Sequence, residues 1–527
     1  MLATMLSATL VALDGRVIRV EVDVAPGLPG FTIVGLGDAS IREARERVRG
    51  ALRNAGFVHP PRRITVNLAP ADVPKTGPAA DLAIAVGILI GSEQFTARPG
   101  RAALIGEVSL GGEIRPVPGL LPMVAALARH GVRRVLVPAD GLAEAALVGG
   151  TESVPVATLA EAVDALRSRR RAAPARPARV ELAPPSPDDG PAAERRTGPT
   201  LTPTEWLPDL ADVRGQVEAR RALEVALAGG HGLLLIGPPG TGKTMLARTI
   251  PTLLPPLDDE DALTATIVAS VSAEGPIRGL VRRPPFRAPH HTSSYAAMVG
   301  GGRLVSPGEV TRADNGVLFL DELAEFSRDV LEALRQPLED GRVTIVRAGG
   351  RAATLPARFQ LVAATNPCQC GNDGDRDGRC TCATGAPEAY MGRISGPLRD
   401  RIDIWVGMPR VPAGVLVGGP DPEPSAVVAA RIAAARDRQL ARPDRRLNAR
   451  VGGRALRAIA RLTPQTSHRL AALAEHERLS GRGTERLLRV ARTIADLESA
   501  ETVEIEHLEE AARWRAPSRQ PLAALAV

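Results

Sequence analysis

The stretch GLLLIGPPGTGKT, residues 232–244, determines the fold of the middle of this chain. Its apolar beginning, 232–237, predicts a buried strand, and the continuation TMLARTI predicts a helix. Between them the residues match the pattern G-x-x-x-x-G-K-[ST], a loop whose backbone N–H groups surround phosphate groups. A strand, this loop and a helix in that order predict an α/β domain that binds a nucleoside triphosphate.

Two side chains of this P-loop are suited to a bound ATP. We expect Lys243 to reach the outer phosphates and the Thr244 hydroxyl to ligate Mg²⁺. A chance glycine turn is the alternative, which the flanking strand and helix disfavour. The remaining loop residues, expected to hold the phosphates through their backbone, are Gly237, Pro238, Pro239, Gly240, Thr241 and Gly242.

Two adjacent carboxylates end the next predicted strand, GVLFLDE at 316–322. Hydrolysis needs one group to bind Mg²⁺, expected to be Asp321, and another to polarise the attacking water, expected to be Glu322. A further strand, FQLVAATN, ends in Asn366, which is expected to orient that water. Strands separated by helices indicate a parallel sheet, so we predict an Mg²⁺-dependent ATPase site along its edge.

Two arginines precede another predicted strand in SGPLRDRIDIWV, residues 395–406. Either Arg399 or Arg401 could be offered to the γ-phosphate of a neighbouring subunit, where it would neutralise charge in the transition state. A solvated arginine at a helix end is the alternative.

The chain divides into four parts by pattern. Residues 1–166 alternate short strands with amphipathic helices, whereas 167–203 are rich in Pro, Ala and Arg without periodicity and predict a linker. Residues 204–415 hold the nucleotide motifs. Residues 425–520 predict a helical domain, with a break at LTPQ (462–465).

Composition favours an acidic partner. The net charge is +7 and the isoelectric point about 9.9, and nucleic acid is the commonest partner of such a protein. A GC-rich genome explains most of the arginine excess, 64 arginines against two lysines. Because aromatic residues make up only 2%, we expect DNA to be held mainly through its phosphates.

Other features predict a cytoplasmic protein without a membrane partner. The longest apolar run, Leu82–Ile90, is far shorter than the ~20 residues that cross a bilayer. Four cysteines in 527 residues fit a reducing compartment.

All four cysteines lie in NPCQCGNDGDRDGRCTC, residues 366–382. Two pairs joined by a polar loop could bind one tetrahedral Zn²⁺, although structural zinc sites more often use C-x₂-C than C-x-C spacing. Reduced free thiols are the alternative. The cysteines are Cys368, Cys370, Cys380 and Cys382.

Several long segments resemble the magnesium-chelatase-like AAA+ proteins of the ComM/YifB family. They are AGGHGLLLIGPPGTGKTMLA, FRAPHHTSS, GGGRLVSPGEVTRADNGVLFLDELAEFSRDVLEALRQPLEDGRVTIVRA and ARFQLVAATNPCQCG, and the resemblance covers nearly the whole chain except the linker. It implies a P-loop AAA+ core with a helical lid, assembled as a ring hexamer. ComM proteins are similar to helicases that drive branch migration in DNA recombination.

The resemblance also implies roles for individual residues. Lys243, Thr244, Asp321, Glu322 and Asn366 take the P-loop, Walker B and sensor-1 roles. Arg401 aligns with the arginine finger, and Arg482 in LSGRGTERLLRVARTIADLE aligns with the sensor-2 arginine of the lid. Arg486, one turn further along the same helix, is the rival for that role.

The segment IGEVSLGGEIRPVPGLLPMVAALARHGVRRVLVP, 105–138, resembles the Lon protease domain. Lon-type enzymes carry a serine and a lysine at positions that hold Ala79 and Leu121 here, so the Ser–Lys dyad has neither nucleophile nor base. Lys75 is a different position. We predict a Lon-like α+β domain without proteolysis, used for assembly or DNA contact.

The segment DGRVTIVRAGGRAATLPAR, 340–358, predicts a hairpin that carries Arg342, Arg347 and Arg351. In the AAA+ clade that the chain resembles, such a hairpin points into the pore of the ring, where arginines would contact DNA phosphates. A solvated edge hairpin is an equal alternative. RDRQLARPDRR, 436–446, is a second basic stretch that an exposed helix face explains equally well.

His290 and His291 are adjacent on one backbone and cannot easily face one ion, so we expect a structural or pore-loop role.

These features together predict an ATP-driven hexamer that moves along DNA, most simply a branch-migration helicase in recombination or natural transformation. The motor subunit of a magnesium chelatase is the first alternative, which requires neither the Lon-like domain nor the basic charge. A remodeller of proteins is the second, although its pore loop would more usually carry an aromatic residue.

Overall fold

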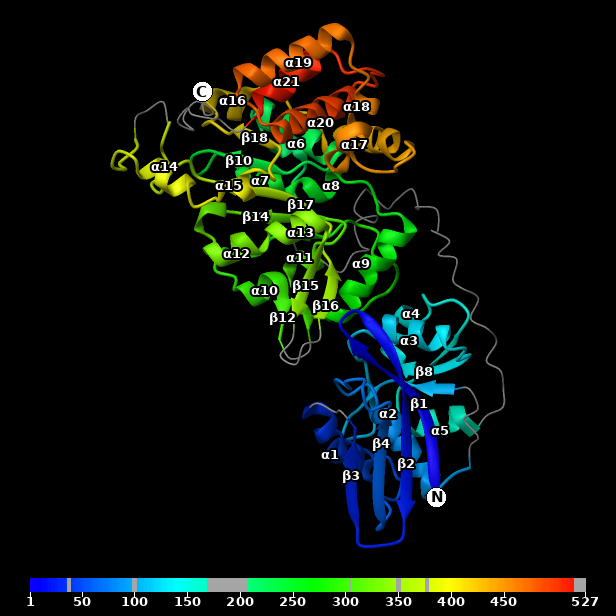
Figure 1. The fold of residues 1–527 in the computed structure, drawn as a ribbon. Helices are drawn as coiled ribbons and strands as arrows, with labels where there is room; N and C mark the ends of the chain where they lie inside the picture. Colours follow the sequence, from blue (N-terminus) through cyan, green and yellow to red (C-terminus); the bar gives the residue numbers. More distant parts are fainter. Residues whose placement is uncertain are drawn as a thin grey trace.

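The computed structural model describes residues 1–35, 39–96, 102–167, 207–302, 305–346, 352–374 and 379–515. Figure 1 shows an N-terminal domain at one end, a nucleotide-motif core in the middle and a group of C-terminal helices at the other end. In the part of the chain that is described, no helix is both long and apolar enough to cross a bilayer.

The N-terminal domain is a seven-stranded mixed sheet in the order β3-β4-β2-β1-β5-β8-β9. Alternate residues of β2, from Ile18 to Val24, are buried because successive side chains of a strand point to opposite faces. Its strands are β1 (Leu2–Val11), β2 (Asp14–Ala25), β3 (Gly30–Val34), β4 (Arg63–Ala69), β5 (Ala102–Leu104), β8 (Arg134–Pro138) and β9 (Glu152–Val156), with the small ladder β6 (Glu107–Val108) and β7 (Ile114–Arg115). Its helices are α1 (Ala39–Asn54), α2 (Asp81–Gly91), α3 (Leu120–Arg129), α4 (Leu142–Ala145) and α5 (Leu159–Arg167).

The core is built on a five-stranded sheet, all parallel, in the order β11-β14-β17-β10-β18. Both faces of the central strand are covered, since Leu233 and Leu235 pack on one side and Leu234 and Ile236 on the other. The strands predicted at 232–237, 316–322 and 359–366 are confirmed. The strands are β10 (Leu233–Ile236), β11 (Phe286–Arg287), β14 (Val317–Leu320), β17 (Gln360–Thr365) and β18 (Ile404–Gly407).

Helices and two small hairpins surround this sheet. The predicted hairpin at 340–358 is present as β15 (Arg342–Val346) and β16 (Ala352–Pro356), paired antiparallel, and β12 (Gly300–Gly301) pairs with β13 (Ser306–Pro307). The helices are α6 (Val217–Gly229), α7 (Lys243–Arg248), α8 (Ile250–Leu253), α9 (Asp259–Ser272), α10 (Tyr295–Val299), α11 (Glu309–Arg312), α12 (Arg328–Ala333), α13 (Arg335–Asp340), α14 (Ala386–Met391), α15 (Gly396–Arg399) and α16 (Ala413–Gly418).

The C-terminal helices pack against the core through α17 and α20, which contact α6. A break is present between α18 and α19 at 461–463, slightly before the predicted 462–465, because Pro464 begins α19. These helices are α17 (Ser425–Leu440), α18 (Gly453–Ala460), α19 (Pro464–His476), α20 (Gly481–Leu497) and α21 (Ile505–Arg513).

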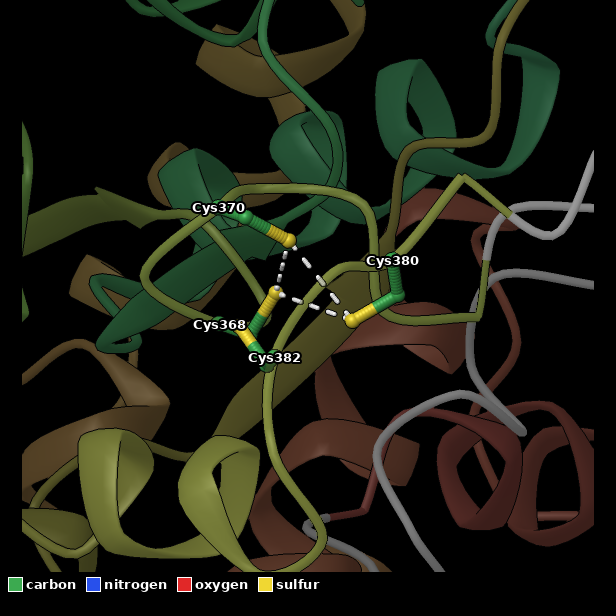
Figure 2. A group of neighbouring side chains, drawn as sticks. All are labelled: Cys368, Cys370, Cys380 and Cys382. Atoms are coloured by element: carbon green, nitrogen blue, oxygen red, sulfur yellow. Dashed lines mark hydrogen bonds between the residues drawn. The ribbon is translucent and has the colours of Figure 1, made fainter.

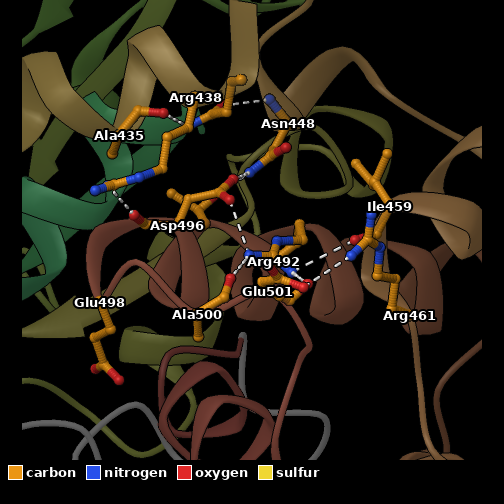
Figure 3. A network of polar contacts seen from close by, with 12 residues as sticks. Ala435, Arg438, Asn448, Ile459, Arg461, Arg492, Asp496, Glu498, Ala500 and Glu501 are labelled. Carbon is orange, nitrogen blue, oxygen red and sulfur yellow. Dashed lines mark hydrogen bonds and ion pairs between the residues drawn. The ribbon is translucent and has the colours of Figure 1, made fainter. Parts of the chain in front are cut away.

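A buried polar network fixes the C-terminal helices to one another (Figure 3). Asp496, on α20, accepts hydrogen bonds from Arg442 Nη2 at 2.5 Å, Asn448 Nδ2 at 2.8 Å and Arg492 Nη2 at 2.9 Å. Arg492 also donates to the carbonyl of Glu501 at 2.9 Å. Asp496 and Arg492 are each 2% exposed, so the single carboxylate balances two cationic groups away from water.

The N-terminal domain docks on the core through α9, which Figure 1 shows beside α3 and α4. Ser270 Oγ donates to Glu144 Oε1 at 2.5 Å, and the Ser270 carbonyl accepts from Gly119 N at 3.0 Å. Leu147 packs against an apolar cluster of the core made of Ala265, Ala269, Ile277 and Val281. Both polar and apolar contacts therefore join the two domains.

We predict that Asp496→Asn destabilises the C-terminal helices, because it leaves Arg442 and Arg492 without a counter-charge. Loss of one partner of a buried ion pair costs about 3–5 kcal/mol in free energy of unfolding. Urea denaturation followed by circular dichroism measures it, with Asp444→Asn, at an exposed position, as the control. Equal midpoints for the two variants would contradict this account of the network.

Candidate nucleotide-binding site

The carboxyl ends of three neighbouring strands bring the predicted ATPase residues together. Lys243 follows β10, Asp321 and Glu322 follow β14, and Asn366 follows β17. Because the strands are parallel, their carboxyl ends meet at one edge of the sheet, where α/β folds bind ligands. These side chains and the P-loop line a cavity of about 380 Å³.

The Lys243 ammonium is folded back onto its own loop. Its Nζ donates to the carbonyls of Gly237 at 2.6 Å and Pro238 at 2.9 Å, and to Asn366 Oδ1 at 3.1 Å. Burial lowers the pKa of Lys243 to about 8, although Asp321 and Glu322 act in the opposite direction. The P-loop lysine is therefore already beside the predicted sensor-1 residue.

The two predicted magnesium ligands are in direct contact. Thr244 Oγ1 donates to Asp321 Oδ2 at 2.7 Å, and Asp321 Oδ1 accepts from the backbone N–H of Glu322 at 3.0 Å. A hydroxyl and a carboxylate are oxygen ligands of the kind that Mg²⁺ prefers. The donor set therefore fits a magnesium ion that accompanies the phosphates.

Glu322, the predicted base, is held by a histidine. Its Oε2 lies 2.9 Å from Nδ1 of His291, whose ring lies 4.2 Å from that of His290 between centroids. Glu322 has φ +54° and ψ +48°, a left-handed conformation that a non-glycine residue adopts only when its surroundings hold it. His291 reaches it because β11 lies beside β14, a neighbour relation that the sequence did not reveal.

Arg401 lies at the other edge of the sheet. It precedes β18, whose first residue Ile404 is paired with Leu233 at the start of β10. The P-loop instead follows the last residue of β10, Ile236. The predicted finger and the P-loop of the same chain thus stand at opposite ends of parallel strands.

Arg401 belongs to a cluster of arginines that includes the predicted sensor-2 residue. Burial and the neighbouring charges of Arg482, Arg486 and Arg335 lower the pKa of Arg401, which also forms an ion pair with Glu339. Arg486 donates to the carboxylate of Asp400 at 3.0 Å and to its carbonyl at 2.8 Å. Arg482 is therefore brought to Arg401, and its rival Arg486 is engaged by Asp400.

Arg399 has a different environment from Arg401. Its guanidinium lies over the ring of Trp405, 5.3 Å from the centroid.

A second cavity, of about 560 Å³, lies beside the P-loop and was missed from the sequence. Gln216 links the two, because its Nε2 donates to the carbonyls of Thr241 at 3.1 Å and Pro409 at 2.8 Å. Its lining is mainly apolar and includes Val217, Val411, Pro412 and Val415. An apolar lining suits a nucleobase.

The four cysteine sulfurs lie within 4.8 Å of one another (Figure 2). Cys368 Sγ is 3.3 Å from Cys370 Sγ and 3.9 Å from Cys380 Sγ, and the last two are 3.6 Å apart. Four thiolates around Zn²⁺, with Zn–S bonds of about 2.3 Å, place sulfurs about 3.8 Å apart. The four sulfurs are therefore compatible with a zinc site. We call the segment that carries them, residues 368–374 and 379–382, the cysteine loop.

Backbone groups of the cysteine loop favour a thiolate at Cys370. The N–H groups of Asn372 and Thr381 donate to the Cys370 sulfur and lower the pKa of that thiol to about 5. The N–H of Asp373 donates to Cys368 Sγ at 3.3 Å, but burial is the larger effect there and raises the pKa of the Cys368 thiol to about 12.

The predicted DNA contacts differ in what the structure describes of them. Arg342 is exposed at the start of β15, while Arg347 and Arg351 lie outside the described residues. In the basic stretch 436–446, Arg436 donates to the Leu227 carbonyl and Arg438 to the Asp496 carbonyl. Arg436 is half-buried against α6, whereas Arg438, Arg445 and Arg446 are exposed. DNA contact and an exposed helix face therefore both stay open for this stretch.

The positions of the missing Lon-type dyad are buried. Ala79 and Leu121 are 5% and 1% exposed, and the buried Lys75 donates to the Pro70 carbonyl. Ala79 lines a cavity of about 220 Å³ that Val305 and Ser306 of the core also line. The core therefore borders the face where a Lon-type enzyme would carry its dyad.

We predict that affinity for ATP falls as the pH rises above about 8. The pKa of Lys243 in the free protein is about 8, and bound phosphates favour the ammonium, so binding at higher pH requires uptake of a proton. The affinity for ATP should then fall by up to about tenfold per pH unit. Calorimetry in two buffers of different ionisation enthalpy measures the uptake.

Lys243→Arg is the control for this titration, since a guanidinium keeps its charge throughout the range. Its affinity should not depend on pH between 8 and 10. A pH-independent affinity of the unmodified protein would contradict the assignment.

Comparisons with known proteins agree with this geometry. Residues 209–416 match the family described as Magnesium chelatase, subunit ChlI. Residues 20–141 match Subunit ChlI of Mg-chelatase, and residues 422–515 match Magnesium chelatase, subunit ChlI C-terminal.

Individual relatives extend the match to nearly the full chain. YifB of Escherichia coli, described as uncharacterized, is 43% identical over 509 residues, which cover 95% of this chain and 94% of YifB. The competence protein ComM of Haemophilus influenzae is 39% identical over 524 residues, which cover 98% of each chain. Lon protease 1 of Sorangium cellulosum is 31% identical over 141 residues, 25% of this chain and 17% of the protease.

Nearly full-length similarity to YifB and ComM shows the family, and the parallel sheet with its P-loop is the AAA+ core that the family match describes. An α+β domain of Lon-like sequence precedes that core. The chain belongs to the magnesium-chelatase-like ComM/YifB family of AAA+ ATPases.

Proposed function

We propose that this protein is an ATP-driven ring motor that moves DNA, with branch migration during recombination or natural transformation as its action. The observation that carries the proposal is the separation of Arg401 from the P-loop of its own chain. The four residues of β10 put roughly 13 Å between the two edges of the sheet. An arginine at one edge and a phosphate site at the other form a complete site only between two subunits.

Such a contact is heterologous, with one edge of a subunit meeting the opposite edge of the next, and heterologous contacts form a ring when the rotation between subunits closes. We propose a homo-hexamer, in agreement with the ring assemblies of the family that the sequence resembles. In it, Arg401 and Arg482 would both face the γ-phosphate held by the neighbouring P-loop. Arg482 would then act on the neighbour's nucleotide together with the finger.

Within the P-loop site each residue has a role in hydrolysis. Lys243 would leave its loop carbonyls to hold the outer phosphates, and Asn366 would orient the attacking water. Thr244 and Asp321 would hold Mg²⁺, which neutralises phosphate charge when bound. Glu322 would accept the proton of the water, for which its carboxylate must leave His291. The cavity beside Gln216 would receive the adenine.

Two observations favour DNA as the partner, the positive net charge and the similarity to ComM. A net charge of +7 favours a polyanion, and the exposed Arg342 begins a hairpin that would face the pore. ComM, the relative that is 39% identical, is named for competence. We propose that arginines of the hairpin, with Arg347 and Arg351, contact phosphates without reading sequence.

A second candidate is the motor subunit of a magnesium-chelatase-type complex, which the family description of residues 209–416 favours. Turnover in that case would respond to a porphyrin-bearing partner and not to DNA.

We also propose that one Zn²⁺ is bound by the four cysteines, on the strength of their mutual distances. Residues Cys368, Cys370, Cys380 and Cys382 would complete its coordination without water, as in structural zinc sites.

Steady-state ATPase with forked DNA, linear duplex and no DNA tests the function. We expect forked DNA to stimulate turnover most, and Arg342→Ala to weaken DNA affinity without changing turnover in the absence of DNA. For about six phosphate contacts, raising salt from 50 to 200 mM should lower DNA affinity by about 10³.

Arg457→Ala, which removes one positive charge at an exposed position of α18 outside the hairpin and the nucleotide site, is the control for net charge. Turnover that no DNA alters, or that only a porphyrin-bearing partner stimulates, would contradict the proposal.

A further inference from the structure

The cysteine loop forms part of the wall of the nucleotide site. Its first cysteine, Cys368, is fully buried and stands two residues after Asn366, the predicted sensor-1 residue. Gly371 N donates to the Cys368 carbonyl at 3.0 Å, which turns the chain back towards the P-loop. The predicted sensor-1 residue and the proposed zinc ligands thus follow one another on a single short segment.

The turn of the cysteine loop touches the P-loop at one point. A Cβ added to Gly371 would stand 2.7 Å from Pro239 Cδ and 3.3 Å from its Cγ. It would also lie 3.9 Å from Asn366 Cγ. Only a glycine allows so close an approach here, so the position of the turn limits where Pro239 and the following loop residues can lie.

The same loop reaches the second cavity of the site. Asn372 Nδ2 donates to the Cys370 carbonyl at 3.2 Å, and Asn372 Oδ1 accepts from Arg410 Nη2 at 3.3 Å. Arg410 lines the cavity assigned to the adenine. The cysteine loop therefore contacts the phosphate end of the site through Pro239 and the base end through Arg410.

Much of the cysteine loop is exposed or only partly buried. Apart from Cys368, its cysteines are only partly buried, and the loop contains no helix or strand among its described residues. A segment of this kind has little packing to fix its position, and a bound metal would supply the missing constraint. The position of the cysteine loop would then depend on the coordination of the metal by the four cysteine sulfurs.

We propose that Zn²⁺ bound by the four cysteines is a brace for ATP binding: it fixes Gly371 against Pro239 and Asn372 against Arg410, so that metal occupancy sets nucleotide affinity. This inference rests on the proposed zinc and ATP sites and deepens them. The metal takes no part in hydrolysis, and Cys370 and its partners are positioning residues. Loss of Zn²⁺ would free the turn and let the P-loop move away from its binding geometry.

The test uses the full-length protein, purified without a metal-affinity tag and without DNA. Zinc per chain is measured by mass spectrometry, and affinity is measured by titrating a fluorescent ATP analogue at fixed Mg²⁺. We expect one Zn²⁺ per chain. A zinc-selective chelator should weaken analogue binding by about tenfold or more, since displacements of about 1 Å have large effects on such sites. Added Zn²⁺ should restore the affinity.

Two glycine variants separate the brace from general damage to the fold. Gly371→Ala should keep the zinc and still weaken analogue binding by about tenfold, because the added methyl group meets Pro239. Gly385→Ala is the matched control, since Gly385 has a similar φ of +81° and nothing within 4 Å of an added Cβ. It should bind the analogue as the unmodified protein does.

Cys370→Ser provides an independent loss of metal, with thermal unfolding measured to confirm that the core is folded. Reduced zinc content together with reduced affinity supports the brace. Unchanged affinity after zinc removal, equal affinity of the two glycine variants, or a protein that holds no zinc would each overturn it. Failure of the untreated protein to bind the analogue would instead refute the ATP site, and absence of DNA stimulation would leave the brace standing.

Discussion

The parallel pairing of β10 with β17 and β18 is the constraint on which the nucleotide site depends. Paired as Leu233 with Val362 and with Ile404, the strands run in the same direction. Residues that directly follow a strand therefore lie at one edge of the sheet, where the carboxyl ends of the strands meet. Residues that directly precede a strand lie at the opposite edge. Lys243 and Asn366 meet at the first edge, and Arg401 stands at the second. In the proposed ring, a single subunit would carry two incomplete halves of a catalytic site, and assembly would join them.

The site is held in a restrained arrangement. The Lys243 ammonium is satisfied by the carbonyls of Gly237 and Pro238, and Glu322 is held at His291. Each contact must give way before phosphates and water can take its place, which gives the protein two points at which binding and turnover can be controlled. The cysteine loop adds a third constraint on the same cavity, from outside the P-loop.

Candidate site residues that directly follow a strand could be predicted from the sequence. Contacts between segments far apart in the chain could not. The P-loop and the residues Asp321, Glu322 and Asn366 could be found because a buried apolar run and a polar end are local signals. His290 and His291 were expected to have a structural or pore-loop role, and the contact of His291 with Glu322 could not be found. The reason is that β11 has only two residues and its place beside β14 is not a local signal. The approach of Gly371 to Pro239 and the link from Gln216 to Thr241 are likewise contacts across the fold. Basic stretches stayed ambiguous, because a charge run does not reveal which of its arginines face solvent and which, like Arg436, donate to a carbonyl.

A mixing experiment with two inactive variants tests the central claim most directly. Glu322→Gln removes the base of its own site, and Arg401→Ala removes the finger offered to the next subunit. Mixed rings should regain turnover at about one interface in four, where an intact Glu322 meets an intact Arg401. A mixture of Glu322→Gln with Lys243→Ala, two defects of the same half, should regain none. Turnover in the first mixture no greater than that of its separate components would contradict the account.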